Sequence, residues 1–235
     1  MSFPTQYTVV VPAAGIGSRM RSARPKQYLT IAGKSIIEHT LNNLLTHTQI
    51  KSIVVVLHPE DETFKQLPIA NDPKVEMVVG GKERSDSVLA GLNHLSDDKQ
   101  WVLVHDAARP CLQHKDLTAL LSLAEQGYDG GILATPVRDT MKRSIPIIGQ
   151  QSKVSHTESR DNLWHALTPQ FFPLGCLKHA LIKAQKQGAE VTDEASAIEY
   201  VGGNVLLVEG LASNIKVTQP EDLLLAEFYL SQNKV

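Results

Sequence analysis

A glycine-rich stretch near the start of the chain has two cations close to it. The apolar run Tyr7 to Val11 leads into Pro12-Ala13-Ala14-Gly15-Ile16-Gly17-Ser18-Arg19-Met20, and Pro25-Lys26-Gln27 follows soon after. Small residues let the backbone approach a ligand closely, and successive N–H groups can point at phosphate oxygens. Arg19 can grip such oxygens bidentately, and Lys26 can act as a mobile point charge. The segment therefore predicts a cradle for a polyphosphate.

Two better-known phosphate-binding loops do not fit these residues. The Walker pattern requires Gly-Lys-Ser/Thr, whereas Gly17 is followed by Ser18-Arg19. The dinucleotide fingerprint requires a third glycine, where this chain has Met20. It also requires an acidic residue at the end of the second strand, where the chain has Leu57-His58-Pro59. A dinucleotide-binding oxidoreductase is therefore disfavoured.

A carboxylate follows another apolar run. Asp106 comes directly after Val102 to His105, and a carboxylate at such a position suits a magnesium ion that bridges triphosphate oxygens. Its alternative role is to cap a helix, but Ala107-Ala108-Arg109-Pro110 does not have the pattern of a helical first turn. An acceptor that is itself a phosphate monoester is ionised at pH 7, because its second pKa is about 6. Such a reaction requires no general base, and we do not assign that role to His105.

Composition and length narrow the class of protein. The chain has 235 residues, a formal charge of −2 and a pI of about 6.5, so it has no basic field of the kind that nucleic-acid binding requires. Cys111 and Cys176 are too few and too far apart for a metal cluster. Without a signal peptide or a long apolar run, we expect a cytoplasmic protein with neither a membrane nor a nucleic acid as partner. We expect one domain, 1–235.

Short β-branched runs alternate with longer amphipathic stretches. We expect buried strands at Val9–Val11, Ile53–Leu57, Val75–Val79, Val102–His105, Ile132–Ala134 and Val205–Val208. We expect helices at Ser35–Thr46, Arg84–Leu95, Lys115–Gln126, Pro173–Gln187, Asp193–Val201 and Pro220–Leu230. This alternation predicts an α/β fold with an open, three-layer, Rossmann-like and mostly parallel sheet, whose ligands collect at the carboxyl ends of the strands. The Gly15 loop and Asp106 both follow predicted strands.

The stretch 136–160 interrupts this rhythm. It is polar and has no convincing apolar period, so the residues alone leave two readings open: a flexible surface loop or a functional segment.

Several further motifs follow in order along the chain. They are Val104-His105-Asp106-Ala107-Ala108-Arg109-Pro110, Pro136-Val137-Arg138-Asp139-Thr140-Met141-Lys142, Ala166-Leu167-Thr168-Pro169-Gln170, Thr192-Asp193-Glu194-Ala195, and Asn214-Ile215-Lys216-Val217-Thr218 before Pro220-Glu221-Asp222. Together with the glycine loop, these motifs resemble the 2-C-methyl-D-erythritol 4-phosphate cytidylyltransferase family, one of the nucleotidyltransferase families that activate sugar and polyol phosphates. The resemblance spans nearly the whole chain.

The resemblance implies a homodimeric enzyme that uses Mg²⁺ and CTP and releases pyrophosphate. It implies that 136–160 is an inserted β-arm used in dimerisation, whose Thr140 completes the partner's substrate pocket. The catalytic residues it implies are Arg19, Lys26, Arg160 and Lys216. The nucleotide-binding residues it implies are Pro12, Ala13, Ala14, Gly15, Gly17, Ser18, Gly80, Gly81, Arg84, Ser87, Asp106 and Ala107. The acceptor-binding residues it implies are Arg109, Thr140, Arg160, Thr168, Thr192 and Lys216. Asp106 is the implied metal ligand.

Two alternatives keep part of this pattern. A cytidylyltransferase for another polyol phosphate, such as ribitol 5-phosphate, would share the nucleotide half of the motifs and differ around Thr140 and Arg160. A noncatalytic nucleotide-binding module would keep the glycine loop, but it has no need for Asp106, Arg109 and Lys216 together.

Overall fold

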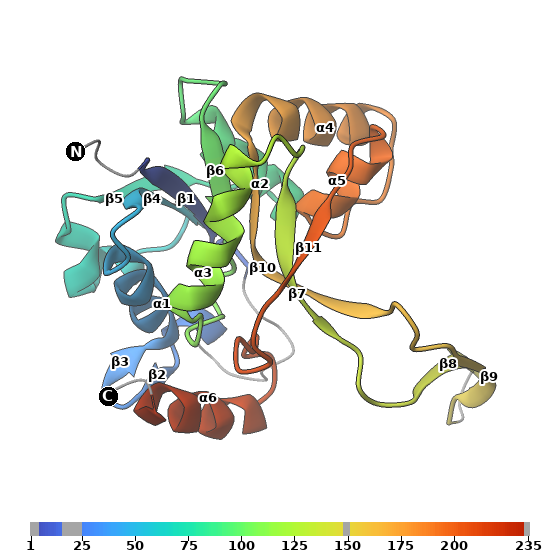
Figure 1. Cartoon of the computed structure of the whole chain (residues 1–235). Coiled ribbons are helices and arrows are strands. Elements are labelled where there is room, and N and C mark those ends of the chain that lie inside the picture. The colour runs from blue at the N-terminus through green and yellow to red at the C-terminus, as the bar shows by residue number, and fades with distance from the viewer. Residues whose placement is uncertain (1–4, 16–24, 148–150, 233–235) are drawn as a thin grey trace.

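The computed structural model of the chain describes residues 5–15, 25–147 and 151–232. A seven-stranded sheet in the order β11-β7-β10-β6-β1-β4-β5 runs through its centre (Figure 1). The strands are β1 (Tyr7–Pro12), β4 (Ile50–Leu57), β5 (Val75–Val79), β6 (Trp101–Val104), β7 (Gly131–Pro136), β10 (Trp164–Pro173) and β11 (Leu206–Glu209). Each of the six predicted strands is present, with shifts of a few residues at the ends.

One strand of this sheet was not predicted. β10 runs antiparallel to both of its neighbours, β6 and β7, whereas the other paired strands are parallel. Its sequence contains Pro169, and a proline inside an apolar run argues against a strand in the middle of a sheet. The pairing with β7 is irregular between Ala166 and Gln170, which accommodates that proline. The sheet is therefore mostly parallel, as expected, with one strand reversed.

Helices cover both faces of the sheet, so alternate side chains of the central strands are buried on opposite faces. Val9 and Val11 of β1 pack with the helices α1 (Ile36–Leu45) and α3 (His114–Leu121). Val10 packs on the other face with α2 (Arg84–Asn93), α4 (Leu174–Lys186) and α5 (Glu194–Tyr200). These two cores make a three-layer α/β arrangement, which confirms the predicted fold class.

Smaller elements complete the body. Short 3-10 helices lie at η2 (Lys26–Tyr28), η3 (Phe64–Gln66), η4 (Pro68–Asn71) and η5 (Ser122–Glu125). The two-residue strands β2 (Thr30–Ile31) and β3 (Lys34–Ser35) pair with each other, and α6 (Glu221–Gln232) packs beside them around a third core of Ile31, Val217 and Ala226. None of the helices in the described ranges is long and apolar enough to cross a membrane.

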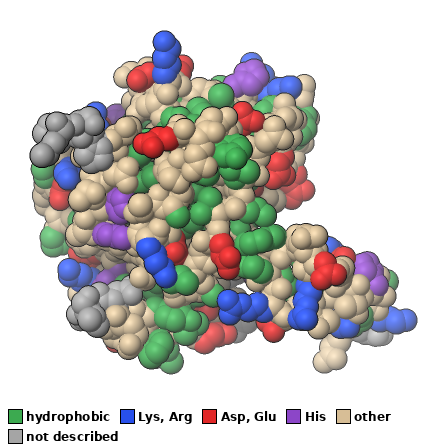
Figure 2. All heavy atoms as spheres, in the orientation of Figure 1, with side chains coloured by type: hydrophobic (Ala, Val, Ile, Leu, Met, Phe, Trp, Pro, Cys, Tyr) green, Lys and Arg blue, Asp and Glu red, His purple; other side chains and the backbone are tan. Residues whose placement is uncertain are grey.

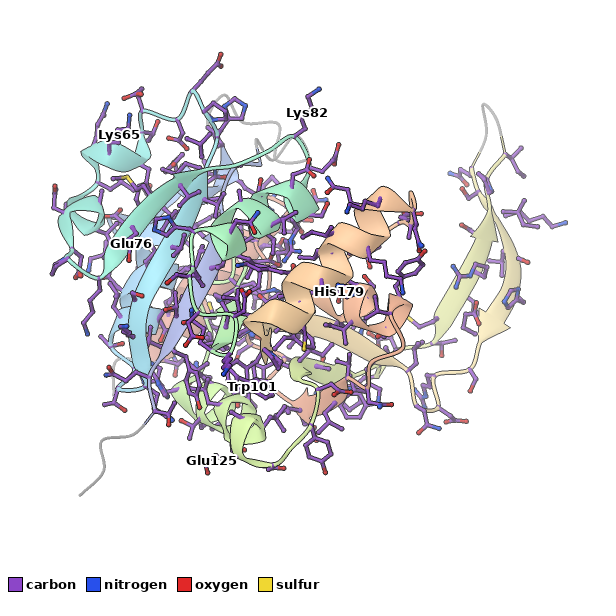
Figure 3. All side chains as sticks on the ribbon, turned by 90° about the horizontal axis from the view of Figure 1, so that it is seen from above. Lys65, Glu76, Lys82, Trp101, Glu125 and His179 are labelled. Atoms are coloured by element: carbon purple, nitrogen blue, oxygen red, sulfur yellow. The ribbon has the colours of Figure 1, made fainter. Side chains whose placement is uncertain are left out.

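The stretch that the sequence left open forms a two-stranded antiparallel ribbon, β8 (Met141–Ile145) with β9 (Lys153–Glu158). The ribbon projects away from the body (Figures 1 and 3). Its side chains are almost all exposed, and Figure 2 shows cations, anions and histidines gathered on it. The ribbon also exposes large apolar side chains, including Ile145 and Val154 at 52% and 55%. We call this ribbon, with the segments that lead into and out of it (136–160), the arm.

Candidate active site

A cleft of about 480 Å³ lies beside the carboxyl ends of β1 and β6. The predicted residues that line it are Pro12, Ala13, Ala14, Gly15, Lys26, Gly81, Arg84, Ser87, Asp106, Ala107 and Lys216. Lys82, Glu83 and Thr218 also line it, although they were not predicted. Lys82 projects outward from the loop before α2 (Figure 3). The fold thus brings together most of the predicted nucleotide residues. Gly17, Ser18 and Arg19 lie outside the described residues.

The loop glycines have two different surroundings. A Cβ added at Gly15 would meet none of the described atoms within 4 Å, and Gly15 lines the cleft. A Cβ at Gly80 would lie 2.7 Å from Ser87 Oγ and 3.0 Å from Ala14 Cβ. Gly80 is not among the residues that line the cleft. It allows the loop before α2 to pack directly against the loop after β1.

Local hydrogen bonds position the first cation. Lys26 begins η2, where its Nζ donates to Val217 O at 3.2 Å. The next residue, Gln27, is buried and donates from Nε2 to Ala13 O at 2.9 Å. These contacts join η2 to the end of β1 and to the Lys216 segment, and Lys26 lines the cleft.

Asp106 is the centre of a cluster of charges at the cleft. Its Oδ1 accepts from Arg84 Nε at 3.3 Å and Nη2 at 3.2 Å. Its Oδ2 accepts from Lys216 Nζ at 2.9 Å and lies 3.4 Å from Arg109 Nε. Burial alone would raise the pKa of Asp106, but the charges of Arg84, Lys216 and Arg109 outweigh it and hold that pKa far below the ordinary range. The carboxylate is therefore ionised under all ordinary conditions.

Arg84 also binds a carboxylate that the sequence analysis did not assign. Its Nη1 donates to Glu194 Oε1 at 2.7 Å, and its Nη2 lies 3.2 Å from Oε2. Burial opposes the positive charge of Arg84, but Glu194 and Asp106 together raise its pKa above the ordinary value. Glu194 follows the predicted Thr192 by two residues, yet nothing local in the sequence signals its partner, which lies 110 residues away.

A buried polar network supports the Asp106 loop. Thr168 Oγ1 accepts from the backbone N–H of Asp106 at 3.0 Å, which leaves its own proton to donate to His105 Nδ1 at 3.0 Å. His105 Nε2 then donates to Arg109 O at 3.1 Å. Burial lowers the pKa of His105 to about 4, so the ring is neutral at pH 7. The histidine therefore bridges Thr168 and the backbone of Arg109.

The predicted acceptor residues fall into two groups: Lys216, Arg109 and Thr168 contact Asp106, whereas the other three do not line the cleft. Arg109 is buried and donates from Nη1 to Asn214 O at 2.7 Å. Thr168 is buried, and its hydroxyl proton is already engaged as described above. Thr140, Arg160 and Thr192 are exposed and do not line the cleft. Arg160 donates to Arg138 O at 2.6 Å at the base of the arm. The cleft of a single chain thus holds the nucleotide half of the predicted site.

The donor set at the cleft can be tested for a fit to magnesium. Among the described residues no group of three His, Cys, Asp or Glu side chains could hold a metal ion by itself. Mg²⁺ is commonly bound through one or two carboxylates together with substrate phosphates and water. A single ionised carboxylate, Asp106, beside a cationic cleft fits that second pattern.

Comparisons with known proteins agree over nearly the full length. The family model described as IspD, 2-C-methyl-D-erythritol 4-phosphate cytidylyltransferase, matches residues 7–232. The chain is 64% identical over 230 residues to the protein of that name from Pseudoalteromonas atlantica, covering 98% of this chain and 97% of the other. It is 59% identical to that from Photorhabdus laumondii, with 95% and 94% covered. The crystal structure of the Francisella tularensis protein matches with a TM-score of 0.81 at 33% identity, covering 96% and 100%.

Proposed function

Since this chain belongs to the 2-C-methyl-D-erythritol 4-phosphate cytidylyltransferase family, we propose that the cleft around Asp106 is where it carries out that family's reaction. The enzyme transfers the cytidylyl group of CTP to 2-C-methyl-D-erythritol 4-phosphate in the non-mevalonate isoprenoid pathway. A phosphate oxygen of the acceptor forms a bond to the α-phosphorus of CTP, and the bond from that phosphorus to the β-phosphate oxygen breaks. Pyrophosphate leaves.

The observation that supports this placement best is the cluster of cations around Asp106. Arg84, Arg109 and Lys216 all contact one carboxylate at a cleft that also exposes the backbone at Gly15. The acceptor phosphate is already ionised near pH 7, because its second pKa is about 6. Catalysis then consists of aligning two anions and neutralising the charge between them. A cleft rich in cations suits that task.

Each cation has a proposed role that follows from its position. Lys26, which lines the cleft, stabilises the departing pyrophosphate. Arg19, outside the described residues, is proposed from the family resemblance to share this role. Lys216 is one-third exposed and reaches the carboxylate from a flexible stem, so it can turn toward the α-phosphate when CTP binds. We propose that the nucleotide lies against Pro12, Ala13, Ala14, Gly15 and Ala107, which line the cleft. Gly17 and Ser18, outside the described residues, remain predicted nucleotide-binding residues.

We place the cytosine at the loop before α2. Ser87 Oγ accepts from Gly81 N–H at 3.2 Å and donates to Glu83 O at 3.2 Å, which fixes the loop in one conformation. Close packing at Gly80 holds it against the first loop. Rigid backbone groups can read the amino donor and carbonyl acceptor of cytosine, and a fixed wall excludes a larger purine.

We propose magnesium as the cofactor, with Asp106 as its protein ligand. A bound Mg²⁺ would neutralise charge on the triphosphate and would orient it. The residues of this chain contribute the ionised carboxylate and the surrounding positive charge. Arg84 and Arg109 keep Asp106 ionised whatever position Lys216 takes.

We propose that the acceptor half is completed by a second copy of the chain. Thr140 and Arg160 lie on the arm, away from the cleft of their own chain. The arm also exposes apolar side chains such as Ile145 and Val154, which a partner would cover. In such a homodimer, the arm of one subunit brings Thr140 and Arg160 to the partner's cleft. Arg109, Thr168 and Thr192, which do not line the cleft of a single chain, are proposed to support the acceptor side of the completed site. We further propose that the enzyme acts in the cytoplasm.

Pyrophosphate release tests the reaction and its acceptor. The purified chain with CTP, Mg²⁺ and 2-C-methyl-D-erythritol 4-phosphate is expected to release one pyrophosphate for each acceptor consumed. Replacement of the acceptor by ribitol 5-phosphate should give a far lower kcat/KM, and replacement of CTP by ATP should do the same. Omission of the acceptor is the control for CTP hydrolysis. If the complete mixture releases no pyrophosphate, or if the two acceptors have equal kcat/KM, the assignment is overturned.

A further inference from the structure

Glu194 is a fully buried carboxylate that the reaction described above does not use. It is the first residue of α5, and only 1% of its surface is exposed. Burial raises the pKa of Glu194, and Arg84 limits that rise. A buried carboxylate is costly unless it is paired, so its position near an active-site cleft calls for a physical role.

The start of α5 is held rigidly in place. The Asp193 side chain caps the helix by accepting from Ser196 N–H at 2.9 Å. Gln170 of β10 makes two hydrogen bonds to the same turn. Its Oε1 accepts from Ala195 N–H at 2.8 Å, and its Nε2 donates to Asp193 Oδ2 at 2.9 Å. Glu194 thus projects from a turn that is anchored to the central sheet.

Arg84 joins this anchored turn to the cleft. Its guanidinium donates to both oxygens of Glu194 and also to Oδ1 of Asp106. The Arg84 side chain is about one-third exposed and lines the cleft, whereas Glu194 does not line it. A long arginine side chain loses considerable rotamer freedom when it is held in one geometry. The two-point contact with Glu194 has already removed that freedom before a ligand arrives.

We propose that Glu194 is a positioning residue for the nucleotide: it holds the guanidinium of Arg84 in the wall of the cleft and acts only through Arg84. The inference rests on the proposed placement of CTP in this cleft. It adds a link between the turn at Thr192, which belongs to the proposed acceptor side, and the nucleotide side.

Two other roles for Glu194 predict a different effect on CTP binding, so the proposal can be tested. If Glu194 served only to balance charge, its neutralisation would make the cleft more positive and would tighten the binding of CTP. If it were purely structural, its loss would lower the melting temperature and the active fraction, with the CTP dissociation constant of the folded enzyme unchanged. Positioning predicts weaker CTP binding in spite of the added positive charge.

The experiment compares E194Q with a matched control on the same helix. E199Q removes the same charge at an exposed position of α5, away from the cleft. Binding of CTP with Mg²⁺ is measured by calorimetry on the full-length proteins, and kcat is measured at saturating substrates. We expect the CTP dissociation constant of E194Q to rise about tenfold, with kcat within about twofold of wild type and E199Q equal to wild type. An unchanged or tighter dissociation constant for E194Q would overturn the proposal.

A second pair of variants tests whether Glu194 acts through Arg84. In an R84Q background, E194Q is expected to cause no further loss of CTP affinity, since the side chain it positions is gone. Additive losses would show an independent role and refute the inference. If E194Q does not fold, E194D decides the matter: it keeps the charge but shortens the reach, and it should weaken CTP binding in the same direction. Failure of the wild-type protein to bind CTP would instead refute the proposed nucleotide site.

Discussion

Replacement of Lys216 by alanine separates transition-state stabilisation from nucleotide binding. In the free enzyme the ammonium of Lys216 lies 2.9 Å from Asp106 Oδ2. When CTP binds, we expect Lys216 to give up this contact for a contact with the α-phosphate. The new ion pair thus replaces an existing one, so its net contribution to ground-state binding is small. In the transition state more negative charge develops on the reacting phosphate, and Lys216 gives up no further contact when it stabilises that charge. Lys216 therefore contributes mainly to the transition state.

The expected magnitudes follow from the surroundings of Lys216. The side chain is one-third exposed, and Asp106 keeps Arg84 and Arg109 as partners, so K216A should cost at most about 1 kcal/mol of stability. Removal of one preorganised charge at a reacting phosphate costs about 10²–10³ in kcat. We therefore expect K216A to lower kcat by about that factor and to raise the CTP dissociation constant by less than about fivefold.

The assay is pyrophosphate release at saturating CTP and acceptor, combined with calorimetric binding of CTP and a thermal unfolding curve. Lys65→Ala is the matched control, because it removes the same charge from an exposed site on η3, outside the cleft (Figure 3). Equal losses in kcat and in CTP affinity would refute the reasoning, and so would a fall in kcat of less than about tenfold.

Three further predictions follow from other parts of the site. Gly15→Ala should leave the melting temperature unchanged but weaken CTP binding, because the new methyl lies at the cleft and meets no atom of the described residues within 4 Å. Gly80→Ala should destabilise the fold, because its Cβ would lie 2.7 Å from Ser87 Oγ. A lower melting temperature for Gly15→Ala, or an unchanged melting temperature for Gly80→Ala, would contradict this prediction. The pKa of His105 is lowered to about 4 in the folded protein but is near 6.5 in the unfolded chain, so unfolding takes up a proton as pH falls. The contribution of His105 to the free energy of unfolding is fully present above about pH 6.5, and it falls by up to about 3 kcal/mol toward pH 4. Urea titrations at several pH values should show that the free energy of unfolding depends less on pH in His105→Gln than in the wild type. An equal pH dependence in the two proteins would refute this prediction. Thr140→Ala should regain activity when mixed with K216A, because one of the two clefts in a mixed dimer then has both residues; absence of complementation would place Thr140 in its own chain's cleft.

Much of the fold could be predicted because it depends on local patterns. Val9–Val11 and Val102–Val104 are apolar, valine-rich runs whose alternate side chains are buried on opposite faces, which is typical of a central parallel strand. α1 begins where a Ser35–Glu38 capping box precedes an apolar periodicity. β10 could not be predicted in this way, because Pro169 and the polar residues around it hide a strand that only its neighbours β6 and β7 reveal.

The sequence by itself identified the ligand class and most of the residues at the cleft. Glycines, lysines and a carboxylate placed just after strands have a local chemical meaning, and the rule that ligands collect at strand ends brings them together without knowledge of side-chain positions. Gly15, Lys26 and Asp106 were assigned on that basis, Lys216 was assigned from the family resemblance, and all four line one cleft.

Only the tertiary structure decided how these charges are balanced. The pairing of Arg84 with Glu194 joins residues 110 positions apart, and the use of Thr168 and His105 as buried supports depends on side-chain packing between β6 and β10. The physical reason is that a pKa or an ion pair depends on burial and on every charge within a few ångströms. A sequence gives the type of each group, but the fold sets its distance from the others.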